Sequence, residues 1–189
     1  MKKFLIIVSL FFTAFQLIAQ NDSYSEEKNE IKRFYVSLTS KAAALNGSWG
    51  LFGGMKAGIN ISEQLSLGLA GYGMIPNRLG GSYINRSGRD TLHFGYGGVD
   101  AEFDLSLSDK TKLTGSILLG AGRVDYENLS GSDYFFIMEP LVSIKYMFTR
   151  WFGLAYSGGY RFAAGVKYAD FSDASFSGWS TDLSIIFKF

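Results

Sequence analysis

The sequence predicts an all-β fold, an eight-stranded antiparallel up-and-down transmembrane β-barrel. Apolar and polar residues alternate with a period of two along eight segments, and helical periodicity is absent from the chain after its N-terminal region. Most of these segments are about ten residues or longer, which is the length that a tilted strand needs to cross a bilayer. An export signal precedes them, as expected for a protein that is inserted outside the inner membrane.

The N-terminal segment has the layout of a secretory signal peptide. Lys2 and Lys3 precede an apolar run over residues 4–15, and the small residue Ala19 follows. The apolar run is shorter than the roughly 20 residues that a membrane-spanning helix requires. We therefore expect cleavage after Ala19, so that residues 1–19 are the signal peptide, 20–30 a polar periplasmic lead-in and 31–189 the barrel. Sequencing of a mature protein that still began at Met1 would contradict this prediction.

The alternation defines the strands of the predicted barrel, in chain order. They cover residues 31–40, 49–60, 64–75, 92–105, 111–124, 134–147, 151–162 and 176–189. Within 92–105, Gly97 and Gly98 predict a β-bulge that shifts the alternation by one residue. The bulge would place Phe94 and Tyr96 on the same face as Val99.

The connections between these segments differ in length in a regular order. Tight turns are predicted after the second, fourth and sixth strands, and longer polar links after the first, third, fifth and seventh. Such alternation is typical of transmembrane barrels, which have short periplasmic turns and long external loops. An even number of strands then places both ends of the barrel on the periplasmic side.

The size of the lumen indicates which face is apolar. An eight-stranded barrel leaves an interior just wide enough for side chains, and the apolar set contains too many aromatic residues to fit there. The opposite face is rich in Gly, Ser, Ala and Thr, so we expect the apolar set to face lipid. Its aromatic members form two bands that resemble interfacial girdles: Trp49, Phe94, Tyr160, Phe162 and Trp179 near the long loops, and Tyr146, Phe148, Trp151, Phe187 and Phe189 near the tight turns. Tyr96, Phe136 and Tyr156 are assigned to the same lipid-facing set.

Charged residues of both signs fall on the predicted inward face and therefore need partners. This predicted lumen charge network consists of Lys56, Asp100, Glu102, Asp104, Glu139, Lys145, Arg161, Asp182 and Lys188. If Phe152 lies opposite Phe148, Glu139 comes close to Arg161, and we expect a buried ion pair between them. The acidic residues at 100, 102 and 104 could instead bind a cation, but pairing with inward lysine and arginine is favoured. A lumen filled in this way would not conduct large solutes.

Composition excludes several classes of function. The chain has no cysteine and one histidine, so disulfides, thiolate metal sites and multi-histidine metal sites are excluded, and no cofactor is expected. Its 18 Lys and Arg residues nearly balance 17 Asp and Glu residues, which gives no support for nucleic-acid binding. A hydrolase centred on His93 would need a serine and a carboxylate within reach, for which Ser82, Ser87 and Asp90 are the candidates. The segment LHFGYG lacks the strand serine that lipid A deacylases have, so we expect no enzyme.

Three segments resemble a known group of proteins. FFIMEPLVSIKYMFTRWFGLAYSGGYRF, NISEQLSLGL and DLSLSDKTKLTGSILLGAG are similar to the strand–turn–strand units of small outer-membrane β-barrel proteins of the Bacteroidota type, which share the general architecture of OmpA/OmpX-like barrels. The resemblance implies location in the outer membrane of a Gram-negative bacterium and is silent about activity.

The C-terminal segment TDLSIIFKF resembles the signal that the barrel assembly machinery reads. Its outward residues are Leu183, Ile185, Phe187 and Phe189. We therefore predict a monomeric outer-membrane barrel without enzymatic activity, whose partners are membrane lipid, the assembly machinery and an unknown partner of its loops. A lipid A-modifying enzyme and a narrow channel or transporter of small apolar ligands are the alternatives.

Overall fold

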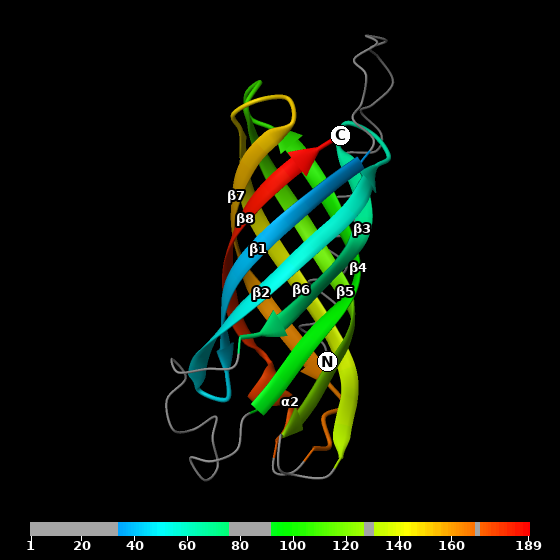
Figure 1. Cartoon of the computed structure of the whole chain (residues 1–189), viewed down its shortest axis with the longest axis vertical. Coiled ribbons are helices and arrows are strands. Elements are labelled where there is room, and N and C mark those ends of the chain that lie inside the picture. The colour runs from blue at the N-terminus through cyan, green and yellow to red at the C-terminus, as the bar shows by residue number, and fades with distance from the viewer. Residues whose placement is uncertain (1–33, 76–91, 127–130, 169–170) are drawn as a thin grey trace, which may run out of the picture. The chain divides into compact units, whose positions relative to one another are not determined.

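The chain forms a closed antiparallel β-barrel, in which each strand pairs with its neighbours in sequence and the last strand pairs with the first (Figure 1). The computed structural model describes residues 34–75, 92–126, 131–168 and 171–189. The strands are β1 (Phe34–Leu45), β2 (Ser48–Asn60), β3 (Leu65–Met74), β4 (Leu92–Ser106), β5 (Thr111–Tyr126), β6 (Ser132–Met147), β7 (Phe152–Ala164) and β8 (Gly178–Lys188). The predicted fold class is confirmed, while the predicted signal peptide and the whole of the predicted lead-in lie outside the described residues.

Among the described residues, one short helix accompanies the strands. Helix α2 (Asp173–Phe176) lies in the connection between β7 and β8. Over the described part of the chain, no helix has both the length and the apolar character needed to cross a membrane.

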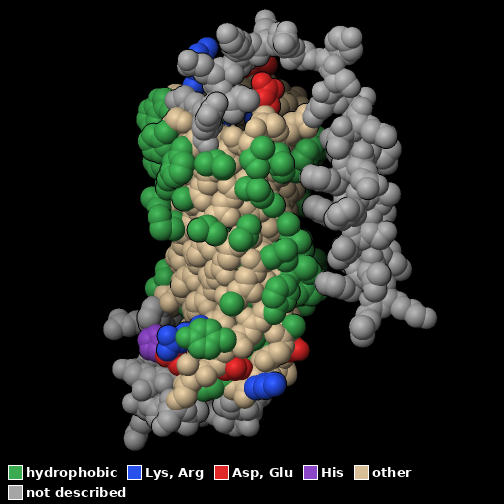
Figure 2. Space-filling view, turned by 90° about the vertical axis from the view of Figure 1, so that its right-hand side faces the viewer, with side chains coloured by type: hydrophobic (Ala, Val, Ile, Leu, Met, Phe, Trp, Pro, Cys, Tyr) green, Lys and Arg blue, Asp and Glu red, His purple; other side chains and the backbone are tan. Residues whose placement is uncertain are grey.

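The two faces of the wall differ in chemistry. Along β1 the side chains alternate between buried and more exposed positions, so that Ser37, Thr39 and Lys41 point into the lumen. Large apolar side chains are exposed on the outer wall, including Leu69 at 66% and Val142 at 59%. Figure 2 shows groups of hydrophobic side chains on the face of the barrel wall that is turned to the viewer. The arrangement reverses that of a soluble barrel, whose apolar face is turned inward.

The first connection is shorter than the sequence analysis predicts. Strand β1 continues to Leu45, and Asn46 and Gly47 alone join it to β2, with φ angles of 45° and 77°. Positive φ at both central residues is the geometry of a type I′ hairpin, for which Asn-Gly is the preferred sequence. The prediction of a long first loop is wrong because the alanines before Asn46 have low strand propensity. The tight turns after β2, β4 and β6 and the longer links after β3, β5 and β7 are as predicted.

The predicted bulge in β4 is also wrong. Strand β4 pairs with β5 without interruption from Leu92 to Ser106, so its alternation keeps one phase throughout. Gly98 lies opposite Gly120, and a Cβ atom on Gly98 would collide with the backbone oxygen of Leu119. The glycines here permit close approach of two backbones instead of adding a residue to the strand. As a consequence, Phe94 and Tyr96 share the inward face with Asp100.

The three tight turns are closed in the same way. Each begins with a hydroxyl residue whose side-chain oxygen accepts a hydrogen bond from the backbone N–H three residues later, at 3.0–3.1 Å. These residues are Ser62, Ser108 and Thr149. Such a bond satisfies a backbone donor that the strand ladder has left free, and so it fixes where each hairpin reverses.

Candidate functional site: the barrel lumen

The lumen contains two layers of different chemistry. Charged and hydroxyl side chains fill the half toward the tight turns, and aromatic side chains fill the half toward the longer connections. The even residues of β4 run through both layers, from Phe94 and Tyr96 to Asp100, Glu102 and Asp104. The inward face therefore changes from aromatic to acidic along a single strand.

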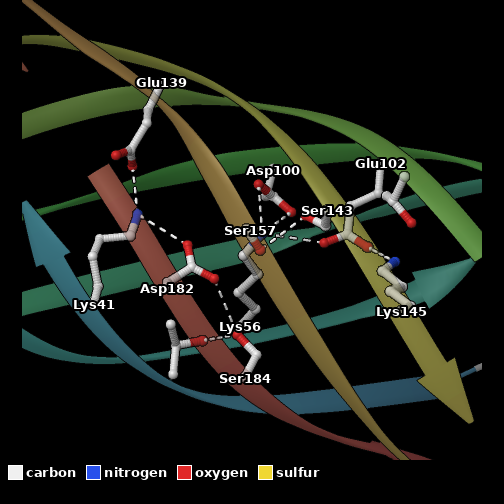
Figure 3. A network of polar contacts seen from close by, with 12 residues as sticks. Lys41, Lys56, Asp100, Glu102, Glu139, Ser143, Lys145, Ser157, Asp182 and Ser184 are labelled. Carbon is white, nitrogen blue, oxygen red and sulfur yellow. Dashed lines mark hydrogen bonds and ion pairs between the residues drawn. The ribbon is translucent and has the colours of Figure 1, made fainter. Parts of the chain in front are cut away.

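The charged layer nearer the tight turns contains alternating lysines and carboxylates. Lys56 Nζ lies 3.1 Å from Asp100 Oδ2 and 3.1 Å from Glu102 Oε1. Lys145 Nζ contacts the other oxygen of Glu102 and lies 3.0 Å from Asp104 Oδ1. These five residues come from three strands, and each is at most 8% exposed. Figure 3 shows four of them, Lys56, Asp100, Glu102 and Lys145. Buried charges are stable only when they are paired in this manner.

The cation at the centre of the lumen is Lys41, which is not a member of the predicted charge network. Its Nζ donates to Glu139 Oε2 at 2.8 Å and to the hydroxyl of Tyr96 at 3.2 Å, and lies 3.7 Å from Asp182 Oδ2. Glu139 also accepts from the hydroxyl of Tyr96 at 2.9 Å and from Ser180 Oγ at 2.7 Å. Lys41 and Glu139 are both fully buried. The Asn46–Gly47 turn is the sequence signal that would have revealed Lys41, because it extends β1 past position 41.

The predicted ion pair between Glu139 and Arg161 does not form. The register is as expected, since Phe148 pairs with Phe152 and the neighbouring pairs set Glu139 across from Arg161. Among the described residues, however, Glu139 takes its cation from Lys41. The side chain of Arg161 is directed into the aromatic layer, where it contacts backbone oxygens and rings. The two residues therefore lie opposite each other in the β6–β7 ladder, but their side chains do not form an ion pair.

The remaining predicted network residues also line the lumen. Asp182 is 4% exposed, and Lys188 lies at the end of the network toward the tight turns. Lys188, Lys145 and Asp182 are among the residues that line a cavity of about 30 Å³. It is large enough to hold at least one water molecule.

The aromatic layer closes the other half of the lumen. Phe176 of α2 is 1% exposed, and its ring centroid lies 4.9 Å from that of Phe94 and 5.0 Å from that of Phe135. Phe52 meets Phe94 edge-on at 5.7 Å. The prediction that Phe94 and Tyr96 face lipid is therefore wrong, since both are at most 5% exposed within this layer.

The candidate catalytic histidine lies outside both layers. His93 is exposed on the outward face of β4 and pairs in the ladder with Asp125. Its candidate partners Ser82, Ser87 and Asp90 lie outside the described residues. Within the described ranges, no cluster of three or more His, Asp or Glu side chains is arranged to hold a metal ion, and the acidic residues of β4 contact lysines instead.

The predicted assembly-signal residues lie on the outer wall of β8. Leu183 is 54% exposed, Ile185 39% and Phe189 68%, while the ring of Phe187 packs 5.8 Å from that of Phe152. Phe187 belongs to a group of contacting rings beside the tight turns, together with Tyr146, Phe148, Trp151 and Phe152. A second group, formed by Tyr160, Phe162 and Trp179, lies toward the other end.

Solved structures with the same architecture are outer-membrane proteins. The chain superposes on Neisserial surface protein A with a TM-score of 0.63 at 15% identity, covering 82% of this chain and 97% of that one. It also matches the N-terminal β-barrel domain of Pseudomonas aeruginosa OprF with a TM-score of 0.57 at 14% identity, again covering 82% and 97%. The chain has the fold of the small outer-membrane β-barrels.

A third barrel with this fold is Ail, the attachment invasion locus protein of Yersinia pestis, solved in complex with the heparin analogue sucrose octasulfate. Its TM-score is 0.51 at 10% identity, and the match covers 82% of this chain and 95% of Ail. No protein-family model and no curated protein sequence matches the chain. Because the identities are low, these outer-membrane barrels show the fold and leave the specific activity open. The Bacteroidota resemblance remains a prediction from the sequence segments.

Proposed function

We propose that the protein is a non-enzymatic, monomeric β-barrel of the bacterial outer membrane that acts as a structural element or as a platform for surface interactions. The observation that carries the proposal is the occupied lumen inside an apolar wall. Lys41 and Glu139 fill the middle of the barrel, and Phe176 and Phe94 fill the half beyond them. Such an interior leaves the external connections as the natural place for a partner to bind.

The outer-membrane location is supported by the exposed apolar wall, the two groups of aromatic rings and the fold shared with outer-membrane proteins. The exported barrel would meet lipid along its wall and the assembly machinery during insertion. Two proteins of the same fold bear the names surface protein and attachment invasion locus protein. These names favour a surface role over transport.

The proposal is tested by conductance and by gel migration. The refolded protein in a planar bilayer is expected to show no stepwise current, because side chains of both layers block the lumen. In SDS without heating it should migrate faster than after boiling, as a closed barrel resists the detergent. Regular open-channel steps would overturn the plugged lumen, and identical migration of both samples would overturn the membrane barrel.

The enzymatic alternative has its own test at His93. Lipid A is extracted from a strain that lacks the native gene and carries either the wild-type protein or His93→Ala. We expect the same lipid A composition from both, because the strand segment LHFGYG that carries His93 has no serine to act as a nucleophile beside it. A lipid A species that disappears only with His93→Ala would support the lipid A-modifying enzyme instead.

A further inference from the structure

Arg161 is a buried cation with an unusual set of partners. It is fully buried, yet among the described residues it forms no ion pair with a carboxylate. Its Nε donates to the backbone oxygen of Phe176 at 2.8 Å and its Nη2 to that of Ala44 at 2.9 Å, while Nη1 has no hydrogen-bond partner. A guanidinium presents a planar fork that matches a carboxylate, so carbonyl oxygens leave part of its capacity unused.

Aromatic rings surround this guanidinium. Its central carbon lies 5.2 Å from the ring centroid of Phe94, 5.2 Å from that of Tyr96 and 5.5 Å from that of Phe52. The ring faces stabilise the positive charge and at the same time provide an apolar wall around it. We call the space bounded by Arg161, Phe52, Phe94 and Phe135 the aromatic chamber.

The occupant of the aromatic chamber is the end of α2. The ring of Phe176 packs against Phe94 and Phe135, and its backbone oxygen accepts from Arg161. Phe176 thus supplies an apolar ring and an acceptor oxygen a few bonds apart. The helix that carries it has four residues, and a hydrogen bond of 2.7 Å from Asn46 N to Ser175 O ties it to the first hairpin.

We propose that the aromatic chamber is a binding site for small apolar carboxylates, and that Phe176 occupies it as an internal substitute. The ring of such a ligand would take the place of the Phe176 ring between Phe94 and Phe135. Its carboxylate would accept from Nε in place of the Phe176 backbone oxygen, and its charge would neutralise the guanidinium. A full negative charge pairs with a buried guanidinium more strongly than a neutral carbonyl oxygen does, which gives the ligand a reason to displace α2.

The charged residues of the lumen close the inner end of the aromatic chamber. Tyr96 borders the chamber and is hydrogen-bonded to Glu139, which is held by Lys41. The ligand would enter from the side of the longer connections and stop at this layer. Binding therefore goes beyond the proposed surface role and does not depend on it, since a barrel without conductance can still hold a ligand at one end.

The test uses 3-phenylpropanoate and its neutral amide, 3-phenylpropanamide, with the complete barrel in lipid nanodiscs and empty nanodiscs as a blank. In Phe176→Ala the chamber is vacated, as apolar cavities made by large-to-small substitutions accept aromatic ligands. Titration calorimetry is expected to show the carboxylate bound at least tenfold more tightly than the amide. Wild-type protein should bind the carboxylate at least tenfold more weakly than Phe176→Ala, because Phe176 must first leave.

Matched variants separate charge recognition from cavity filling. Phe176→Leu, which refills much of the chamber, should lie between the wild type and Phe176→Ala in affinity, and it provides the same comparison should Phe176→Ala fail to fold. Adding Arg161→Gln to either variant should abolish the preference for the carboxylate while gel migration still reports a closed barrel. The proposal is overturned if folded Phe176 variants bind neither compound, or bind the acid and the amide equally.

Discussion

Lys41 holds the two central carboxylates of the lumen from one position on β1. Its ammonium group contacts Glu139 at 2.8 Å and Asp182 at 3.7 Å, and it lies 3.9 Å from the ring centroid of Tyr72. Lys41 and Glu139 have no exposure to solvent. The loss of such a cation leaves a buried carboxylate with its full desolvation cost.

Replacement of Lys41 by methionine is expected to lower the free energy of unfolding by about 3–5 kcal/mol, because the charge of Glu139 then has no cation beside it. Urea titration of the folded barrel in lipid vesicles, followed by tryptophan fluorescence, measures the change. Adding Glu139→Leu to Lys41→Met should restore part of the loss, because it removes the buried charge of Glu139, while Asp182 still lacks its contact with Lys41.

Lys112 provides the matched control for this prediction. Its side chain is 24% exposed and lies 3.4 Å from Asp104 Oδ2, which Lys145 also neutralises. Lys112→Met should therefore cost less than about 1 kcal/mol. Equal losses for the two substitutions would show that depth in the lumen does not govern the strength of these pairs.

The inward orientation of the charged residues was easier to infer from the sequence than the identity of their ion-pair partners. The inward position of Glu139 and Arg161 followed from alternation and charge, because a charged side chain in a barrel wall has only the lumen to face. Their partners depended on side-chain direction: Arg161 extends toward aromatic rings, and Lys41 reaches Glu139 from a different strand. No pattern within one strand carries that information.

The tight turns show how local chemistry defines an element. At the β4–β5 turn, Ser108 Oγ accepts from Thr111 N at 3.1 Å, and Ser108 N donates to Thr111 O at 3.1 Å. The β2–β3 and β6–β7 turns repeat both contacts with their own hydroxyl residues. One hydroxyl group thus completes the closing pair of each hairpin.

Ser108→Ala is expected to destabilise the barrel by about 1 kcal/mol, the usual net worth of one hydrogen bond. At the equivalent position of the β6–β7 turn, Thr149→Ser keeps the hydroxyl group and should leave stability unchanged. Both are measured by the same urea titration. A Thr149→Ser loss as large as that of Ser108→Ala would indicate that the methyl group of Thr149 also stabilises the β6–β7 turn, and an unchanged stability of Ser108→Ala would contradict the role of the hydrogen bond.

The positions of the strands could be predicted from the sequence where the alternation of apolar and polar residues was strict. The residues at which the strands begin and end could not. Most of the lipid-facing residues of β2 and β8 were assigned from alternation alone, since an outward polar residue would meet the bilayer. In β4, two adjacent glycines obscured the phase of the alternation. The close approach of the neighbouring strands explains both, since a Cβ atom on Gly97 would collide with Ala70 O of β3 and one on Gly98 with Leu119 O of β5, which only the paired structure reveals.

At the scale of the whole molecule, the barrel is closed by the pairing of β1 with β8. Phe189 takes part in this seam, as its N–H donates to Phe34 O at 2.8 Å and its oxygen accepts from Phe34 N at 3.4 Å. Its side chain is 68% exposed on the outer wall. The backbone of Phe189 therefore pairs with β1, while its ring is free to contact molecules on the outside of β8.

Deletion of Phe189 is expected to slow assembly into the outer membrane more than it lowers the stability of the finished barrel. The deletion removes only two hydrogen bonds from a seam that continues over nine further residue pairs, while it takes away the terminal aromatic ring. Pulse-chase appearance of the heat-modifiable form measures assembly, and Phe189→Tyr, which retains the ring, should assemble normally. Unchanged assembly kinetics of the deletion variant would contradict the role of Phe189 as a signal.

The same seam brings Phe34 and Phe189 within hydrogen-bonding distance, so the two ends of the barrel are adjacent in space. A circular permutant can therefore be made by linking these ends and opening the chain at the β4–β5 turn. It would retain every strand pairing of the barrel. Only the covalent link between β4 and β5 would be lost, and β4 would become the last strand of the chain. Such a protein would distinguish the sequence features needed to fold the barrel from those needed to insert it into the outer membrane.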